Sequence, residues 1–543
     1  MCGILAIQGK SPVPDIRVLT RTMKHRGPDE FDQVTFQDGS VLAHERLSII
    51  DLVTGRQPLR GCRDAWVIHN GEIYNHQVLR QTILKGHTFH STCDSEVIVH
   101  LFEDHGPDFC NLLDGVFAFA VKDGDRFMAA RDPIGVKPLY YGFDNEGTIY
   151  FASEMKAIHT YCQELRSFPP GFYYTPETGF IQYYKPQWAV PETPVIPFDP
   201  AALRYRLIRA VKKRLMSDVP LGVLLSGGLD SSLIASITKR LMAGRKEPLH
   251  SFSVGLSPDA PDMKAAREVA QFLGTEHHEV IFTIEEGLAA LEQVIWHLET
   301  YDVTTIRAAT PMYLLSKAIR EAGIKVVLSG EGSDEIFGGY LYFHNAPSAA
   351  EFRTETIRRV LRLSTADCLR ADKSTMAHGI EARVPFLDKR FLDLAMRIDP
   401  EEKQPSHRTG KPEKYILRKA FDTPADPWLP DHILWRQKEQ FGDGVGYSWI
   451  DSIIEYAEKM VNNREISLAA LRYSYNTPDT KEALLFRKLF EKQYPSVPAA
   501  RTVLRWIPKW QDSKDPSGRV ADHHEQHVDE LESKKKVKAK LAS

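Results

Sequence analysis

The sequence contains few cysteines, and they are scattered along the chain. There are six in 543 residues, and no two form a CxxC pair. The sequence therefore shows neither the ligand spacing of a zinc site nor the dense pattern of a disulfide framework. Five of the six are expected to be packed thiols: Cys62, Cys93, Cys110, Cys162 and Cys368. Cys2 differs because it stands next to the initiator methionine.

The sequence also lacks a charge excess and long apolar runs. Lys and Arg number 69, Asp and Glu number 72, and the net charge of −3 argues against a nucleic-acid binder. No stretch is typical of a membrane span, and the first ten residues do not resemble a secretory signal. We therefore expect a soluble, cytoplasmic protein with no nucleic-acid or membrane partner. Its length predicts several structural units or two large domains.

The Walker phosphate-binding motif, GxxxxGK[ST], is absent as well. Residues 224–232 read LLSGGLDSS, between an apolar run at 219–225 and apolar residues at helical spacing from Leu233 onward. This pattern predicts a strand, a tight turn and a helix. The two glycines let an anion approach the backbone at the helix N-terminus. Asp230 would repel phosphate unless Mg²⁺ lay between them, so the loop suits pyrophosphate as a leaving group. An ordinary Gly/Ser turn is the alternative.

Strands and helices alternate after this loop, which predicts a doubly wound parallel sheet with ligands at the strands' carboxyl ends. The expected strands are 250–255, 278–282 and 324–328, and the expected helices are 263–273, 284–298 and 312–321. The last strand leads into the acidic loop SGEGSDE at 329–335. Asp230 and Asp334 could hold Mg²⁺, Glu331 could act as a base toward ammonia, and Lys438 could neutralise an α-phosphate. Alternatively, these acids only solvate an exposed loop.

The amino-terminal part offers a second candidate site. If Met1 is removed, Cys2 carries both a thiol and an α-amino group that titrates near pH 8, so one residue supplies nucleophile and base. Asn70 and Gly71 can point two donors at one oxyanion. Arg46 could grip a substrate carboxylate, and Asp94 could pair with a substrate ammonium. Taken singly, each of these residues is better explained as a turn residue or a surface charge.

Changes in composition indicate the domain boundaries. Apolar strands at 39–49, 65–70, 116–122, 126–130 and 150–153 predict a layered α/β domain over residues 1–185. Residues 186–200 are proline-rich and predict a linker without regular structure. A helix at 203–215 opens the second domain, 201–515. Residues 516–543 are polar and lysine-rich and predict a disordered tail, and the HHEQH stretch at 523–527 does not match HExxH.

These motifs together resemble known families. SGGLDSS at 226–232 resembles the pyrophosphate loop of ATP pyrophosphatases, and Cys2 with NGEIYN at 70–75 resembles class II, amino-terminal-nucleophile glutamine amidotransferases. The likeness to glutamine-hydrolysing asparagine synthetases covers both domains. It includes YDVTTIR at 301–307, EARVPFLD at 381–388 and WRQKEQF at 435–441. It implies an Ntn-type four-layer αββα glutaminase domain and a C-terminal doubly wound parallel-sheet ATP pyrophosphatase (PP-loop) domain.

The resemblance also implies roles for individual residues. Cys2 would attack glutamine, Asn70 and Gly71 would form the oxyanion hole, and Thr304 and Arg307 would help form a β-aspartyl adenylate. Asp367 would belong to the acceptor site. Glutamine would contact Arg46, Leu47, Ser48, Ile49, Ile50, Asn70, Gly71, Glu72 and Asp94. ATP would contact Leu224, Ser226, Gly227, Gly228, Asp230, Ser231, Val254, Ser329 and Gly330.

The resulting interpretation is a coupled reaction. Glutamine is hydrolysed, and ammonia crosses a dry, apolar passage and attacks aspartyl-AMP made from ATP and aspartate with Mg²⁺. The protein could form a homodimer. Two alternatives stay open: the same two domains acting on another carboxylate, as in β-lactam-forming relatives, and a non-catalytic sensor of glutamine or nucleotide.

Overall fold

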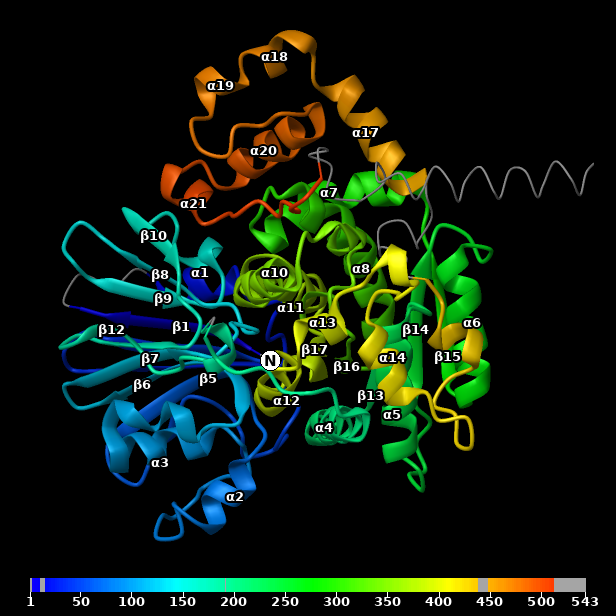
Figure 1. Ribbon diagram of the computed structural model, residues 1–543. Helices are drawn as coiled ribbons and strands as arrows, with labels where there is room; N and C mark the ends of the chain where they lie inside the picture. Colours follow the sequence, from blue (N-terminus) through cyan, green and yellow to red (C-terminus); the bar gives the residue numbers. More distant parts are fainter. Residues whose placement is uncertain (1, 10–14, 191, 438–447, 512–543) are drawn as a thin grey trace, which may run out of the picture.

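The computed structural model describes residues 2–9, 15–190, 192–437 and 448–511 (Figure 1). Its amino-terminal part contains two six-stranded antiparallel sheets. The first has the order β10-β8-β9-β1-β3-β2, with β1 (Gly3–Gln8), β2 (Glu30–Thr35), β3 (Val41–Arg46), β8 (Tyr140–Phe143), β9 (Ile149–Ala152) and β10 (Glu164–Ser167). The second has the order β12-β11-β7-β6-β5-β4, with β4 (Leu59–Arg60), β5 (Ala65–Ile73), β6 (Gly115–Asp123), β7 (Arg126–Arg131), β11 (Phe172–Thr175) and β12 (Gly179–Gln182).

The two sheets pack face to face, and helices cover their outer faces. Between the sheets lie buried apolar side chains from both, among them Ile4, Leu42, Ile68 and Ala118. Helix α1 (Ile16–Arg21) contacts the first sheet, and α3 (Glu96–His105) contacts the second, with α2 (His76–Gln81) beside it. Inner strands such as β1 and β6 are buried along almost their whole length and are largely apolar on both sides, whereas the edge strands β2, β10 and β12 are partly exposed. The predicted four-layer αββα arrangement is confirmed.

The carboxy-terminal part is built on a five-stranded parallel sheet of order β15-β14-β13-β16-β17. Its strands are β13 (Leu221–Leu224), β14 (His250–Gly255), β15 (Glu276–Ile281), β16 (Val326–Leu328) and β17 (Glu381–Arg383). The chain runs outward from β13 in both directions, first through β14 and β15 and then through β16 and β17. The predicted doubly wound sheet is confirmed, and its topological switch lies between β13 and β16, where such sheets bind ligands.

Helices surround this sheet. Asp199 caps α4, and Thr283 closes a capping box at the start of α7, so the expected helices at 203–215 and 284–298 are confirmed. The helices as far as α15 are α4 (Pro200–Lys213), α5 (Leu229–Leu241), α6 (Pro261–Leu273), α7 (Ile284–Leu298), α8 (Val303–Glu321), α9 (Ser333–Phe337), α10 (Ala349–Arg362), α11 (Asp367–Met376), α12 (Lys389–Ala395), α13 (Pro400–Lys403), α14 (Tyr415–Phe421) and α15 (Asp431–Leu434).

Helix α8 corrects one expectation. The helix does not begin at Met312, after Pro311, but at Val303, and it runs through the proline. Asp302 caps it through the backbone N–H and hydroxyl of Thr305. Because Pro311 has no N–H, the Arg307 carbonyl cannot receive the usual helical hydrogen bond from that position. It accepts one from the indole Nε1 of Trp449 instead, at 3.0 Å.

Two other expectations need correction. The proline-rich segment is not wholly irregular, because residues 187–189 form a 3₁₀ turn around the fully buried Trp188. A proline at the start of such a turn removes no needed N–H.

Cys62 is not a packed thiol: it lies exposed in the loop between β4 and β5, whereas the other four cysteines in that group are buried.

The last described segment forms α17 (Ser448–Met460), α18 (Asn463–Ser467), α19 (Ala469–Arg472), α20 (Lys481–Gln493) and α21 (Val497–Arg501), which gather beside α7 in Figure 1. The predicted tail lies outside the described residues. Among the described residues, no helix is long and apolar enough to cross a membrane.

Buried charges connect the two parts of the molecule. Arg26 donates to Glu154 at 2.9 Å within the amino-terminal part and to Asp372 of α11 at 2.7 Å. Glu72 at the end of β5 pairs with Arg383 of β17 at 3.0 Å. One apolar core cluster also spans both parts and includes Val116 and Val384. The edge strand β17 therefore lies directly against the amino-terminal domain.

Candidate functional site

Cys2 lies at the start of β1, where backbone groups surround it. Its side chain is only 6 % exposed. Its backbone nitrogen donates to Asn70 Oδ1 at 2.9 Å, and its carbonyl accepts from Arg26 Nε at 3.1 Å. Burial raises the pKa of the Cys2 thiol, although a hydrogen bond from the Leu47 backbone lowers it. The thiol therefore needs a neighbouring base before it can act as a nucleophile near neutral pH.

Asn70 and Gly71 follow one another on β5, as the oxyanion-hole prediction requires. The side-chain oxygen of Asn70 accepts a hydrogen bond from the Cys2 nitrogen. Its Nδ2 is buried and has no hydrogen-bond partner among the described residues. Gly71 has a φ of 150°, and a Cβ there would lie 2.0 Å from the Val116 carbonyl oxygen. Only glycine fits this close strand pairing. A buried, uncommitted amide donor thus lies next to Cys2.

The residues predicted to hold the amino-acid end of glutamine are fixed by different partners. Arg46 pairs with Glu30 at 2.6 Å and donates to the carbonyls of Ile50 and Asp51, which shapes the 47–50 loop. Asp94 accepts from the Ile73 backbone at 2.7 Å, and burial raises its pKa. The structure therefore uses the Arg46 guanidinium to hold the loop whose backbone was predicted to contact glutamine.

Glu72 joins this region to the second domain. Its Oε1 pairs with Arg383, and the same guanidinium binds Glu381. Burial raises the pKa of Glu72, with a further contribution from the nearby Glu381 carboxylate, while Arg383 lowers it. The Arg383 guanidinium offsets the negative charge of these two adjacent buried carboxyl groups. Arg383 therefore holds a predicted glutamine-binding residue in place from the other domain.

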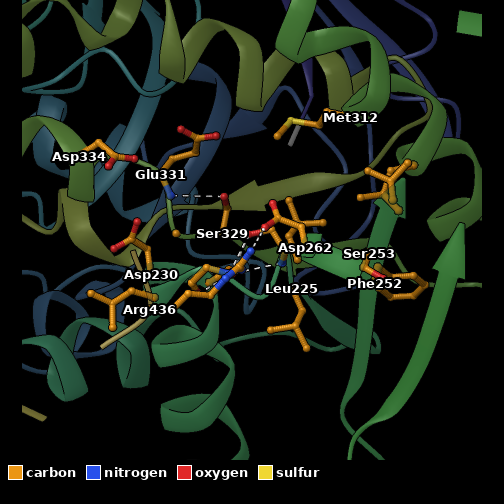
Figure 2. Close-up of a pocket in the computed structure, with 18 of the residues that line it drawn as sticks. Leu225, Asp230, Phe252, Ser253, Asp262, Met312, Ser329, Glu331, Asp334 and Arg436 are labelled. Carbon is orange, nitrogen blue, oxygen red and sulfur yellow. Dashed lines mark hydrogen bonds and ion pairs between the residues drawn. The ribbon is translucent and has the colours of Figure 1, made fainter. Parts of the chain in front are cut away.

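The second site is a cavity at the carboxyl ends of β13, β14 and β16, with about 1110 Å³ of space that includes its opening to solvent. Figure 2 shows the acids Asp230, Glu331 and Asp334 toward one end and Phe252 toward the other. The predicted residues that line it are Leu224, Ser226, Gly228, Asp230, Ser231, Val254, Ser329, Gly330, Glu331 and Asp334.

The glycines of the two loops let the loops touch. A Cβ on Gly330 would lie 2.9 Å from both the Asp230 Cβ and the Ser231 backbone nitrogen. Gly227 has a φ of 75°, and a Cβ there would lie 2.5 Å from the Ala266 nitrogen. Gly227 does not line the cavity itself, but its carbonyl accepts from Arg436 at 3.2 Å. Close backbone approach thus brings the two predicted loops to one place.

A single lysine holds Asp230 and Asp334 together. Lys414 directly precedes α14 and pairs with both carboxylates. Its Nζ lies 2.7 Å from Asp334 Oδ1. Asp230 also accepts from the Ser333 hydroxyl at 2.7 Å. Mg²⁺ prefers carboxylate oxygens as protein ligands, and the shared lysine shows that these two carboxylates lie close enough to bind one cation.

Glu331 forms a two-point ion pair across the cavity. Both of its oxygens accept from Arg370 Nη2 at 2.8 Å, and Arg370 also pairs with Asp367 at 3.1 Å. Burial raises the pKa of Glu331, and the Arg370 charge partly offsets this. Glu331 is thus a partly buried carboxylate whose pKa is lowered by Arg370 and raised by the neighbouring Asp367.

Four predicted residues that the structure describes do not line the cavity: Gly227, Thr304, Arg307 and Asp367. Arg307 pairs with Glu482 of α20 at 2.6 Å, and Thr304 has a buried hydroxyl with no hydrogen-bond partner among the described residues. Lys438 lies outside the described residues. Sequence reasoning missed several lining side chains, because each comes from a strand, helix or loop outside the glycine motifs: Phe252, Asp262, Met312, Arg370, Lys414, Arg418 and Arg436.

Comparisons with known proteins agree with this two-site architecture. A family model described as "Glutamine amidotransferase domain" matches residues 1–169, and one described as "Asparagine synthase" matches residues 202–354 and 346–511. A "Probable asparagine synthetase [glutamine-hydrolyzing]" of Dictyostelium discoideum is 52% identical over 96% of this chain and 99% of its own. Proteins named "Asparagine synthetase [glutamine-hydrolyzing]" of Brassica oleracea and the same name with suffix 1 of Arabidopsis thaliana are each 50% identical over 96% of this chain, covering 93% and 94% of their own.

Proposed function

Because the chain belongs to the glutamine-hydrolysing asparagine synthetases, we propose that Cys2 starts the reaction and that the cavity at Asp230 and Asp334 completes it. The protein uses glutamine, aspartate and ATP to make asparagine. The assignment of individual steps to residues is our proposal. It depends most on one observation: two chemically complementary sites, one around a buried cysteine and one at a parallel sheet's switch point, are joined by a shared core.

In the first half-reaction, the Cys2 sulfur attacks the side-chain carbonyl carbon of glutamine. The α-amino group exposed by removal of Met1 takes the thiol proton and passes it to the leaving nitrogen, so ammonia departs. Asn70 Nδ2 and the Gly71 N–H stabilise the oxyanion, and Asp94 with Glu72 orients the substrate ammonium. The 46–50 segment holds the substrate's other end. Water then hydrolyses the thioester and releases glutamate.

In the second half-reaction, the side-chain carboxylate of aspartate attacks the α-phosphorus of ATP. The bond between the α- and β-phosphates breaks, and pyrophosphate leaves toward the loop at 226–231. Asp230 and Asp334 would hold Mg²⁺, which when bound neutralises phosphate charge. Leu224, Val254, Ser329 and Gly330 would line the adenosine. Thr304, Arg307 and Lys438 would assist adenylation, and Asp367 would contact the acceptor.

Ammonia then attacks the acyl carbon of β-aspartyl-AMP, and AMP leaves. Glu331 takes the proton that the nitrogen loses, a role that its burial and raised pKa support. Uncharged ammonia is favoured in an apolar environment. The mixed core around Val116 and Val384 supports an apolar passage between the two sites.

Two further parts of the proposal concern the cellular location of the enzyme and its assembly. All six cysteines are free thiols, which supports a reducing, cytoplasmic location. A homodimer stays a prediction, which a molar-mass measurement by light scattering would test.

A product assay tests the proposed function. The full chain is incubated with ATP, Mg²⁺, aspartate and glutamine labelled with ¹⁵N in its side-chain amide. We expect AMP, pyrophosphate, glutamate and asparagine labelled in its side chain, in equal amounts. Production of ADP would contradict the adenylate route. A labelled amide on another carboxylic acid, but not on aspartate, would favour a different acceptor, and no turnover would favour a sensor.

A further inference from the structure

Four side chains with metal-ligand chemistry converge on the outer face of the amino-terminal domain, away from both sites described above. Cys62 comes from the loop after β4, His87 precedes α3, and His100 and Glu103 lie on α3. One ligand atom from each lies within 4.8 Å of the others. We propose that these four residues, the α3 cluster, form a structural binding site for one divalent transition-metal ion, with Zn²⁺ as the best match.

The spacing of the ligand atoms fits a tetrahedral ion. Glu103 Oε2 lies 3.0 Å from His100 Nδ1 and 3.6 Å from His87 Nδ1. Bonds of about 2.0–2.3 Å to a tetrahedral Zn²⁺ separate neighbouring ligands by roughly 3.3–3.8 Å. The two histidines and the carboxylate therefore need only small shifts to share one ion. A set of one thiolate, two imidazoles and one carboxylate is a normal zinc ligand set.

The second nitrogen of each histidine faces another carboxylate. His87 Nε2 lies 2.8 Å from Asp104 Oδ2, and His100 Nε2 lies 3.6 Å from Glu96 Oε1. His100 is fully buried, and its Nε2 has no hydrogen-bond partner among the described residues. Histidines that bind a metal through one nitrogen are usually oriented by a carboxylate at the other.

Hydrogen bonds already bring the ligand groups of the α3 cluster together. Glu103 Oε1 accepts from the Arg63 backbone nitrogen at 2.7 Å, and its Oε2 accepts from the Cys62 backbone nitrogen at 3.3 Å. The Cys62 thiol donates to the Thr88 carbonyl at 3.5 Å. These bonds hold the loop that carries Cys62 against α3, so an ion would enter a site whose ligand groups are already close together.

Four protein ligands would close the coordination sphere, which is typical of structural rather than catalytic zinc. Binding would convert the Cys62 thiol to a thiolate and release its proton to solvent. The ion would tie the β4–β5 loop to α3. This helix directly follows Asp94 and Ser95, and Asp94 accepts a hydrogen bond from Ile73 of β5. The site would thus stiffen one wall of the glutaminase domain.

Metal binding to the full chain tests the proposal. Because residues 523–527 read HHEQH, the background variant replaces His523, His524 and His527 by Ala, and no purification tag is left. Co²⁺ titration of this background should give one equivalent of bound ion with a thiolate-to-cobalt charge-transfer band, and Zn²⁺ should displace it. Release of one proton per Zn²⁺ should accompany binding. No bound ion, or an ion without the thiolate band, would overturn the proposal.

Further variants in that background locate the ion. Cys62→Ser should abolish the thiolate band, and Asp104→Asn, which changes only an orienting residue, should weaken Zn²⁺ binding about 10–100-fold. His105→Ala, on the same helix but outside the cluster, should bind as the background does. Zn²⁺ should raise the Tm of the background and of His105→Ala, but not of Cys62→Ser. Unchanged binding in Cys62→Ser would overturn the proposal. So would loss of binding in His278→Ala, which removes the separate group of His250, Glu276 and His278.

Discussion

The two reaction sites differ in how they present polar groups. Around Cys2 most polar contacts are made by neutral groups: its backbone nitrogen donates to Asn70 Oδ1, the Leu47 backbone donates to its thiol, and Asn70 Nδ2 has no partner among the described residues. The charged contact, from Arg26, is to the Cys2 backbone carbonyl. In the nucleotide cavity the polar groups are charges held in pairs, with Lys414 between two aspartates and Arg370 on Glu331. Figure 2 shows these acids gathered at one end of the cavity.

This difference matches the chemistry that each site would perform. Thioester formation develops one negative charge on one oxygen, which fixed neutral donors stabilise without reorganisation. During adenylation, negative charge is redistributed over several phosphate oxygens. Cationic side chains and metal ions stabilise this charge. Changes at Cys2 should therefore affect one half-reaction only, whereas changes in the cavity should affect synthesis from any nitrogen donor.

The largest effect is expected for Cys2→Ala. Removing the nucleophile should lower glutamine hydrolysis and glutamine-dependent synthesis by at least about 10³-fold. Synthesis from added ammonium should stay near the wild-type rate, because the cavity is untouched. Coupled assays for glutamate and AMP measure the two activities separately. Cys162→Ala, a buried cysteine away from both sites, is the control; loss of both activities in folded Cys2→Ala would refute the independence of the sites.

The next largest effect is expected for Asp334→Asn. Loss of one of the two carboxylates paired with Lys414 should lower AMP formation about 10²-fold with either nitrogen donor. It should also raise the Mg²⁺ concentration needed for half-maximal rate. Glutamine hydrolysis by Cys2 should persist. Asp259→Asn changes an exposed aspartate and should behave as wild type. An unchanged Mg²⁺ requirement in Asp334→Asn would argue against the metal assignment.

A smaller, pH-dependent effect is expected for Arg370→Gln. Arg370 lowers the pKa of Glu331, so its removal should let burial raise that pKa further. A base acts only when it is deprotonated, and the acid limb of synthesis from ammonium should therefore move to higher pH. The loss should be greater at about pH 6 than at about pH 8.5. The acid limb of glutamine hydrolysis should not move, and an equal shift in both reactions would indicate a general structural defect.

These predictions also mark what the sequence could and could not reveal. The strands, the helices and both glycine-containing loops follow from local patterns, because apolar periodicity and turn residues act over short stretches. The acids Asp230, Glu331 and Asp334 stand inside those loops and were therefore found. Their partners Lys414 and Arg370 are ordinary basic residues on distant helices and loops. Only the packing of the chain brings them into the cavity, and no local pattern distinguishes them from surface charges.

The backbone of α8 likewise depends on a distant contact that local sequence patterns do not reveal. A substitution that removes this contact has the smallest predicted effect. Pro311 alone predicts a helix boundary, since a local pattern does not include the Trp449 indole that binds the Arg307 carbonyl. Trp449→Phe should lower the free energy of unfolding by about 1 kcal/mol through the lost hydrogen bond. Synthesis should fall slightly because Arg307 shifts, while glutamine hydrolysis should not change.

A double-mutant cycle with Pro311→Ala isolates that hydrogen bond. Alanine at position 311 supplies the N–H that proline lacks, so the Arg307 carbonyl regains a helical donor and depends less on the indole. In this background, Trp449→Phe should therefore cost less than in the wild-type chain, as measured by urea denaturation. Equal costs in both backgrounds would mean that Trp449 stabilises the molecule through packing alone. In that case α8 would tolerate Pro311 without the indole donor. The hydrogen bond from Trp449 to the Arg307 carbonyl would then contribute nothing to the stability of the second domain.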